Sequence, residues 1–250
     1  LIAKNCNPVI VVGSGFSQAV LGLSIEYPDT EFAILNDASV SALNVHSLIF
    51  NEKQGAFIAG FAAALSSKTG KVAMIATSNQ ADLYKDGFIA GALAAKKSVK
   101  TSVKYVSGSA TSAGKSLMTA GADVIYMARP GSSADIFTAI TSRNSAAAKK
   151  SKFYPVRLIS QDPDQYVTVS AATKKYLLAS VVKRVDIAIY DIISNAVAGR
   201  ADLDVLDSVA GIYGRRYDLA RGIELRIFDP SLSRLSAQID KAAVSASKNS

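Results

Sequence analysis

The feature that most constrains the fold is a regular alternation of short apolar runs with amphipathic segments. Runs of four apolar residues recur along the chain, and most are followed by a stretch in which apolar residues return every three or four positions. A strand buried on both faces reads as a continuous apolar run, and a helix that packs on one side reads as an amphipathic segment. The order therefore predicts an α/β fold in which parallel sheets are covered by helices on both faces.

The same pattern places the elements one by one. Pro8 and Gly13 bound the first apolar run, and Pro28 ends the helical pattern that follows it. The expected strands are 9–12, 32–35, 72–75, 124–127, 156–159 and 222–228. The expected helices are 16–23, 52–66, 81–97, 111–120, 132–142, 182–197 and a last one that starts at Ser231.

The number of sheets depends on the connections. No linker rich in proline, glycine or serine divides the chain, so one large doubly wound sheet and two smaller sheets both fit the order of elements. If there are two lobes, the chain crosses between them in short extended segments with polar edges. Val45–Phe50 and Ser160–Gln165 are the best candidates for such crossings.

The charge pattern bears on possible partners. The 28 basic residues exceed the 20 acidic ones and give a net charge of +8, but the excess is scattered in pairs such as Lys96-Lys97 and Lys149-Lys150. No basic stripe interleaved with aromatic residues is present, which favours solvated faces over a nucleic-acid surface. The longest apolar run, Ala56 to Leu65, is too short to cross a bilayer. The single cysteine, Cys6, excludes an internal disulfide and a multi-cysteine metal site.

Catalytic signals are sparse. His46 is the only histidine, and nothing near it in the sequence resembles a nucleophile elbow, so we expect a structural role for it and no catalytic residue. No cluster suggests a metal site. Gly13-Ser14-Gly15 follows a strand and Asp37 ends the next one, as in a dinucleotide-binding turn, but Gln18 stands where the third glycine belongs. A dinucleotide-dependent enzyme therefore stays open as an alternative.

Seven segments, taken in order, resemble successive motifs of one family, the basic membrane protein family of nucleoside-binding lipoproteins. They are Val11–Phe16, Tyr27–Ile34, Asn51–Gly60, Thr69–Val72, Gly87–Gly91, Gly121–Ile125 and Ser180–Asp186. The resemblance extends over nearly all of the chain to about residue 200. It implies a type I periplasmic-binding-protein fold, in which two three-layer αβα lobes with parallel sheets are joined by a hinge.

The resemblance also implies a domain division and a function. The expected lobes are 1–48 with 166–205, and 51–161 with 206–230, followed by a C-terminal helix and tail over 231–250. A monomeric extracytoplasmic receptor of this family captures a purine nucleoside without any cofactor and delivers it to the permease of an ABC transporter. A sensor or regulator core for a sugar, built on the same fold, is a further alternative.

The ligand residues follow from the resemblance and from the strand ends. In the family, the acid of an Asp-Ser-Asp-Gln turn and the lysine of the Ser-Val-Val-Lys motif hold the ribose hydroxyls, and they match Asp162 and Lys183. Open α/β sheets bind ligands outside the carboxyl ends of their strands. The turns expected to contribute there carry Phe16, Asn36, Asp37, Gly131, Ser132 and Asp162.

Two departures from the family pattern lead to further expectations. The family begins with a strand, an acid-rich loop and a helix that match nothing in this chain, so we expect the natural gene to encode them before Leu1, together with a signal peptide and a lipid-anchored cysteine. The membrane would then be reached only through that anchor. The family's Gly-Ser-Phe loop reads Gly108-Ser109-Ala110 here, which removes an aromatic contact to the base that Phe16, Tyr84 or Phe88 could supply instead.

Overall fold

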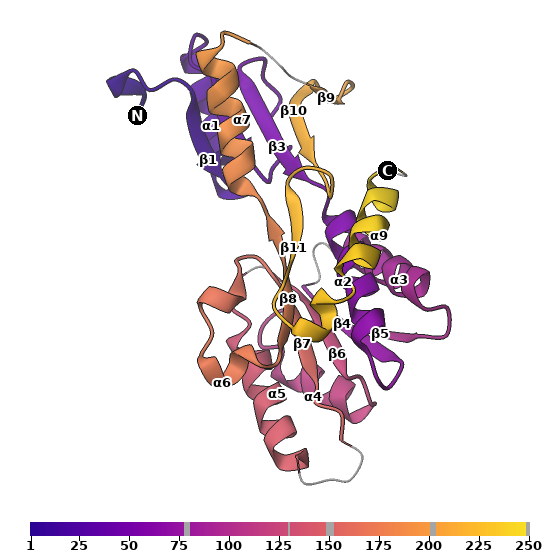
Figure 1. Cartoon of the computed structure of the whole chain (residues 1–250). Coiled ribbons are helices and arrows are strands. Elements are labelled where there is room, and N and C mark those ends of the chain that lie inside the picture. The colour runs from indigo at the N-terminus through magenta and orange to yellow at the C-terminus, as the bar shows by residue number, and fades with distance from the viewer. Residues whose placement is uncertain (78–80, 130, 149–152, 201–203, 249–250) are drawn as a thin grey trace. The chain divides into compact units, whose positions relative to one another are not determined.

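The computed structural model describes residues 1–77, 81–129, 131–148, 153–200 and 204–248. The chain forms two compact units (Figure 1). Unit 1 comprises Leu1–Asn51 and Arg184–Gly222, and unit 2 comprises Glu52–Lys183 and Ile223–Ser250. The chain therefore passes from one unit to the other after Asn51, after Lys183 and after Gly222.

Unit 1 is built on a five-stranded sheet of order β1-β2-β3-β10-β9. The strands are β1 (Val9–Val12), β2 (Phe32–Leu35), β3 (Val45–Phe50), β9 (Asp204–Asp207) and β10 (Ile212–Tyr217). All neighbouring pairs are parallel except β9 with β10. The accompanying helices are η1 (Ile2–Lys4), η2 (Ser14–Phe16), α1 (Ser17–Glu26) and α7 (Val185–Val197).

The core of unit 1 joins α1 to the sheet. Val20 of α1 packs with Val9, Phe32 and Ile34 from the first two strands, all of them buried. These are the continuous apolar runs of the sequence, and burial on both faces explains why they do not alternate with polar residues.

Unit 2 is built on a six-stranded sheet of order β11-β8-β7-β6-β4-β5. The strands are β4 (Lys71–Ala76), β5 (Lys100–Tyr105), β6 (Val124–Ala128), β7 (Arg157–Gln161), β8 (Leu177–Lys183) and β11 (Ile223–Ile227). Only β11 runs antiparallel to its neighbour, β8. The helices are α2 (Glu52–Ser66), α3 (Ala81–Ala95), α4 (Thr111–Thr119), α5 (Ala134–Ala147), η4 (Gln165–Val167), α6 (Ala171–Lys174), α8 (Pro230–Ser233) and α9 (Ser236–Lys248).

Helices α2 and α3 approach each other through glycines. A Cβ atom built on Gly60 would lie 2.0 Å from the carbonyl oxygen of Phe88, and one built on Gly91 would lie 1.9 Å from that of Phe57. Both distances are far below van der Waals contact, so only glycine allows the two backbones to come this close. A Cβ on Gly87 of α3 would likewise lie 2.2 Å from the carbonyl oxygen of Lys53, so the N-terminal turn of α2, which begins at Glu52, also packs directly on α3.

Most expected elements are present, with one shift that matters for the site. The helix expected from Val182 begins at Val185, and Val182 and Lys183 instead end strand β8. Lys183 is thus at the carboxyl end of a parallel strand and not in the first turn of a helix. Leu177–Lys183 is a continuous, largely buried run, which accounts for its place inside the sheet.

The two units also differ in their boundaries from the expected lobes. Residues 166–183 belong to unit 2, because β8 pairs with β7, and residues 206–222 belong to unit 1, because β10 pairs with β3. The chain stays in unit 2 through Ser160–Gln165, where a crossing was expected.

Among the described residues, no helix is both long and apolar enough to span a membrane.

Candidate ligand-binding site

Unit 2 gathers polar side chains at the carboxyl ends of its parallel strands. Asp162 follows β7, and Lys183 is the last residue of β8, the neighbouring strand. Glu52 is the first residue of α2, where the helix dipole favours an acid. With Tyr84 of α3 and Gln161 of β7, these residues form a connected group that we call the carboxyl-edge cluster.

Lys183 is held by two carboxylates. Its ammonium forms an ion pair with Oε1 of Glu52 and lies 3.8 Å from Oδ2 of Asp162, which is too far for a hydrogen bond. The backbone N–H of Lys183 donates to Oδ1 of Asp162 at 2.8 Å. The other oxygen, Oδ2, is buried and accepts no hydrogen bond from the described residues. A buried carboxylate oxygen that accepts no hydrogen bond is costly, and the Lys183 ammonium at 3.8 Å offsets part of that cost.

A chain of hydrogen bonds from neighbouring side chains holds the Glu52 carboxylate in place. The hydroxyl of Tyr84 donates to Oε2 of Glu52 at 2.5 Å, and Nε2 of Gln161 donates to the same oxygen at 3.0 Å. The hydroxyl of Tyr126 donates to Oε1 of Gln161, and the Tyr126 ring stacks on Phe88 with ring centres 5.8 Å apart. The cluster is therefore anchored in the core of unit 2.

Burial sets the protonation of these groups. Burial raises the pKa of Asp162, and the charge of Glu52 adds to this, while the N–H and ammonium of Lys183 act in the opposite direction. Burial and then the Glu52 carboxylate raise the pKa of Tyr84. Burial likewise raises the pKa of Tyr126. Both phenols keep their protons at neutral pH and serve as donors.

Gly131 and Ser132 lie beside Asp162 in the loop after β6. The N–H of Gly131 donates to the backbone carbonyl of Asp162 at 2.7 Å, and its own carbonyl accepts from Nε2 of Gln165 at 2.7 Å. Gly131 has a φ of 92°, in the region that favours glycine. The structure thus brings together four of the predicted residues, Gly131, Ser132, Asp162 and Lys183.

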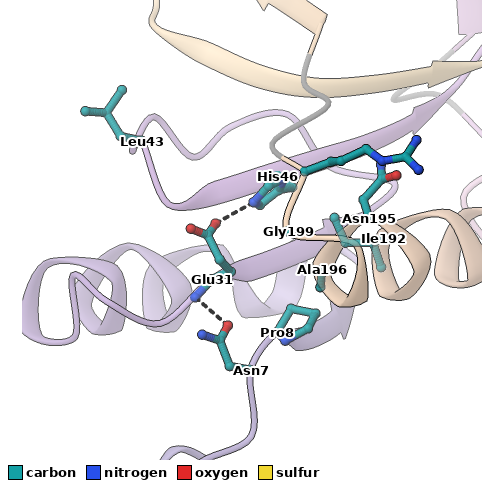
Figure 2. Close-up of a pocket in the computed structure, with 10 residues that line it drawn as sticks. Asn7, Pro8, Glu31, Leu43, His46, Ile192, Asn195, Ala196 and Gly199 are labelled. Atoms are coloured by element: carbon teal, nitrogen blue, oxygen red, sulfur yellow. Dashed lines mark hydrogen bonds and ion pairs between the residues drawn. The ribbon is translucent and has the colours of Figure 1, made fainter.

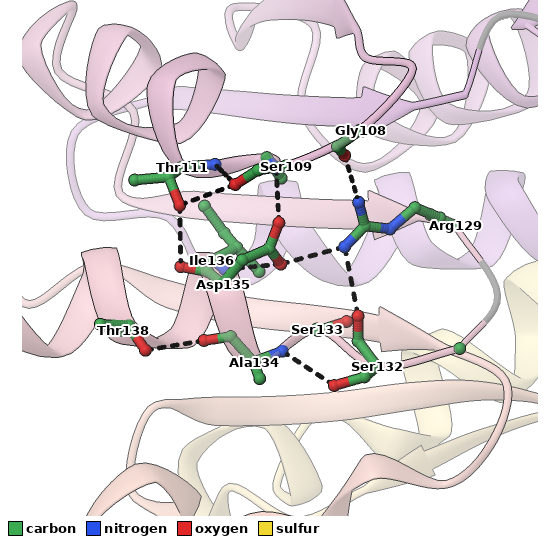
Figure 3. Close-up of polar contacts among 12 residues, drawn as sticks. Gly108, Ser109, Thr111, Arg129, Ser132, Ser133, Ala134, Asp135, Ile136 and Thr138 are labelled. Carbon is green, nitrogen blue, oxygen red and sulfur yellow. Dashed lines mark hydrogen bonds and ion pairs between the residues drawn. The ribbon is translucent and has the colours of Figure 1, made fainter.

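Arg129 ties this loop to the loop after β5 (Figure 3). Its guanidinium donates to the carbonyl oxygens of Gly108 at 2.7 Å and Ser132 at 3.2 Å, and it pairs with Asp135 at 3.0 Å. Asp135 also accepts the N–H of Ala110 at 2.5 Å. Ala110 is fully buried at the start of α4, so the small side chain at this position packs in the core of unit 2.

The remaining predicted residues, Phe16, Asn36 and Asp37, belong to unit 1 and lie at the carboxyl ends of β1 and β2. Phe16 is 50% exposed and precedes α1. The carboxylate of Asp37 accepts hydrogen bonds from the hydroxyls of Ser17 and Ser39. Asn36 has a φ of 62°, and its N–H donates to the carbonyl of Leu48 at 2.7 Å. Asp37 is therefore engaged in holding the first turn of α1.

A separate cavity of about 330 Å³ lies within unit 1, near the start of the strands (Figure 2). Its lining includes His46, whose Nε2 is 2.5 Å from a carboxylate oxygen of Glu31. The side chain of Asn7 accepts the backbone N–H of Glu31 at 2.9 Å. His46 is 7% exposed and lies in β3, and the Glu31 carboxylate pairs with one of its two ring nitrogens.

Sequence reasoning missed Glu52 and Gln161 as site residues, and it considered Tyr84 only as an aromatic contact to the base and not as a hydrogen-bond donor to Glu52. One signal was available, since Glu52 is the single acid of α2, a helix whose other residues are mostly small or apolar and buried. Gln161 carried no such signal, because a glutamine after a strand is ordinary, and nothing in the sequence linked Tyr84 to Glu52. Among the described residues, no group of three or more histidine, cysteine, aspartate or glutamate side chains could hold a metal ion.

The chain is similar to known proteins over most of its length. The chain is 27% identical over 206 residues to the ABC transporter nucleoside-binding protein BmpA of Lactococcus lactis, covering 76% of this chain and 58% of that protein. It is 30% identical over 188 residues to the transcriptional activator protein med of Bacillus subtilis, covering 73% and 53%. The chain thus spans little more than half the length of these relatives.

The fold has solved counterparts. An ABC transporter solute-binding protein from Conexibacter woesei superposes with a TM-score of 0.69 over 98% of this chain and 79% of that one, at 18% identity. The fold is that of type I periplasmic solute-binding proteins, with two sheets in which parallel pairs dominate. The family described as "ABC transporter substrate-binding protein PnrA-like" matches residues 1–209. The chain therefore belongs to this family, Bmp.

Proposed function

We propose that this chain is the ligand-binding body of an extracytoplasmic, monomeric receptor that captures a purine nucleoside and delivers it to the permease of an ABC transporter. Family membership supports the receptor role, and the name of the Lactococcus relative supports a nucleoside as the ligand. Because the chain spans little more than half of its relatives, the transporter partner and the lipid anchor are part of the proposal.

The observation that carries the proposal is the buried Oδ2 of Asp162, which accepts no hydrogen bond from the described residues, beside the ammonium of Lys183. The two hydroxyls of a ribose offer donors and lone pairs on adjacent carbons. A carboxylate that accepts and an ammonium that donates satisfy both without selecting a base. The side chains of Asp162 and Lys183 are 20% and 12% exposed, so water competes weakly for them.

The remaining predicted residues have supporting roles in the proposal. The amides and carbonyls around Gly131 and Ser132 would border the sugar. Phe16 would offer the base a stacking surface, because its ring is half exposed at the end of a strand. Asn36 and Asp37 would border the base from the same unit.

Two other functions compete with the receptor. A dinucleotide-dependent enzyme would use the Gly13-Ser14-Gly15 turn and Asp37, but the Asp37 carboxylate is already bonded to two serine hydroxyls. A sensor or regulator core is supported by the likeness to the Bacillus subtilis activator, and a sugar as its ligand is part of this alternative. That core would use the same carboxyl-edge cluster, with ribose or another sugar in place of a nucleoside.

Thermal unfolding with a panel of ligands distinguishes the nucleoside receptor, the dinucleotide-dependent enzyme and the sugar sensor. A ligand that binds only the folded state at 100 times its Kd stabilises the protein by about 2.7 kcal/mol. We expect guanosine, inosine or adenosine to raise Tm, and ribose and NAD to leave it unchanged. A shift with NAD alone would discard the receptor, and a shift with ribose alone would favour the sugar sensor.

A further inference from the structure

We propose that Glu52 is a positioning residue that holds the Lys183 ammonium away from Asp162 and so keeps an Asp162 oxygen open for the ligand. The inference rests on the proposed function, because it assigns the open oxygen to a ribose hydroxyl. Glu52 itself need not touch the ligand.

The contacts of Glu52 account for this role. One carboxylate oxygen pairs with Lys183, and the other accepts from Tyr84 at 2.5 Å and from Gln161 at 3.0 Å. Its side chain is 12% exposed, and the N-terminal turn of α2 that carries it is fixed against α3. A carboxylate bonded on both oxygens in a buried place has one rotamer available, so it presents a fixed anion to Lys183.

The fixed carboxylate of Glu52 determines where the Lys183 ammonium lies. With two carboxylates in reach, an ammonium takes the place where the sum of the attractions is greatest, and here it forms a close pair with Glu52 while remaining 3.8 Å from Asp162. Without Glu52, the only carboxylate of the cluster left to Lys183 would be that of Asp162. The ammonium would then close on Oδ2, and a ribose hydroxyl would have to displace it.

The same geometry provides a readout that does not need a ligand. Glu52 and Asp162 are two buried carboxylates that share one cation. Removing the Glu52 charge and moving the ammonium toward Asp162 both favour the ionised form of Asp162. The pKa of the Asp162 carboxyl should therefore fall in a Glu52→Gln variant, whereas a loss of packing alone would leave it in place.

The experiment combines this measurement with binding. Glu52→Gln keeps the shape of the side chain and removes its charge. Glu52→Asp keeps the charge on a side chain that is one methylene shorter. Glu31→Gln, the same isosteric change at a carboxylate paired with His46 in unit 1, is the matched control. Asp162 is followed by ¹³C NMR of its carboxyl carbon without ligand, and inosine and hypoxanthine are titrated calorimetrically.

We expect Glu52→Gln to lower the pKa of Asp162 and to weaken inosine binding about tenfold. Hypoxanthine binding should be unchanged, and Glu52→Asp should weaken inosine binding to a smaller extent. Glu31→Gln should match the wild type in the Asp162 pKa and in inosine binding. An unchanged Asp162 pKa in a folded Glu52→Gln protein would overturn the inference. If the wild type binds no nucleoside, the proposed function fails, and an unchanged Asp162 pKa in the Glu52→Gln protein would still overturn the positioning role by itself.

Discussion

Substituting Gly91 by alanine should destabilise unit 2 by about 2 kcal/mol, although alanine is the better helix former. The added Cβ would lie 1.9 Å from the carbonyl oxygen of Phe57, and a backbone atom cannot rotate away as a side chain can. Helices α2 and α3 would have to separate by on the order of 1 Å, a movement typical of overpacked cores that costs about 1 to 3 kcal/mol. The gain in helix propensity offsets at most about 1 kcal/mol. We therefore expect a net loss of stability near the middle of the range of about 1 to 3 kcal/mol.

Gly22→Ala is the matched control, because Gly22 also lies inside a helix but has no atom within 4 Å of the added Cβ. We expect this variant to be about 0.5 to 1 kcal/mol more stable than the wild type. Thermal unfolding by circular dichroism should show Gly91→Ala falling by about 4 to 8 °C and Gly22→Ala rising slightly. If Gly91→Ala unfolds at or above the wild-type temperature, the close packing of α2 on α3 is not as described.

Two further predictions concern stability. Burial alone would raise the pKa of Asp135, but the N–H groups of Ala110 and Ile136 and the guanidinium of Arg129 bring it below its usual range. Asp135 therefore binds its proton less readily in the folded state and adds stability that is lost as the pH falls below about 4. Asp135→Ala should lower the stability at pH 7 and flatten this acid limb in urea titrations at several pH values. Asn144→Ala should lower the free energy of unfolding by about 2 to 4 kcal/mol in the same assay, because the buried Asn144 amide bonds both the N–H and the carbonyl of Val156 at 2.9 Å. A decrease of less than about 1 kcal/mol would contradict these two hydrogen bonds.

Much of the fold was predictable because its central strands are buried on both faces. Phe32–Leu35 and Val124–Ala128 have every residue buried, and the sequence marks them as continuous apolar runs. Strand β10 was not predictable in this way, because Ile212–Tyr217 contains a glycine and two arginines. Its place depends on distant residues: a Cβ on Gly214 would lie 1.8 Å from the Ser47 carbonyl oxygen, and Arg215 pairs with the buried Asp191 at 3.4 Å.

The site was predictable only in part. Asp162 and Lys183 could be named because they match family motifs, and strand ends indicated Gly131 and Ser132. The partner of Lys183 could not be named, because the chain separates Glu52 from Lys183 by most of unit 2. Their contact depends on the parallel pairing of β7 with β8 and on the packing of α2, which no local pattern encodes.

The most direct test of the ribose contact is a calorimetric titration of wild type, Asp162→Ala and Lys183→Ala with a nucleoside and its free base, for example inosine and hypoxanthine. Hydrogen bonds to charged groups contribute about 1.5 to 3 kcal/mol, so each substitution should weaken inosine binding by roughly 10- to 100-fold. Hypoxanthine binding should remain nearly the same in all three proteins, because the lost contacts are to the sugar. Unchanged inosine affinity in both folded variants would contradict the assignment of Asp162 and Lys183 to the ribose.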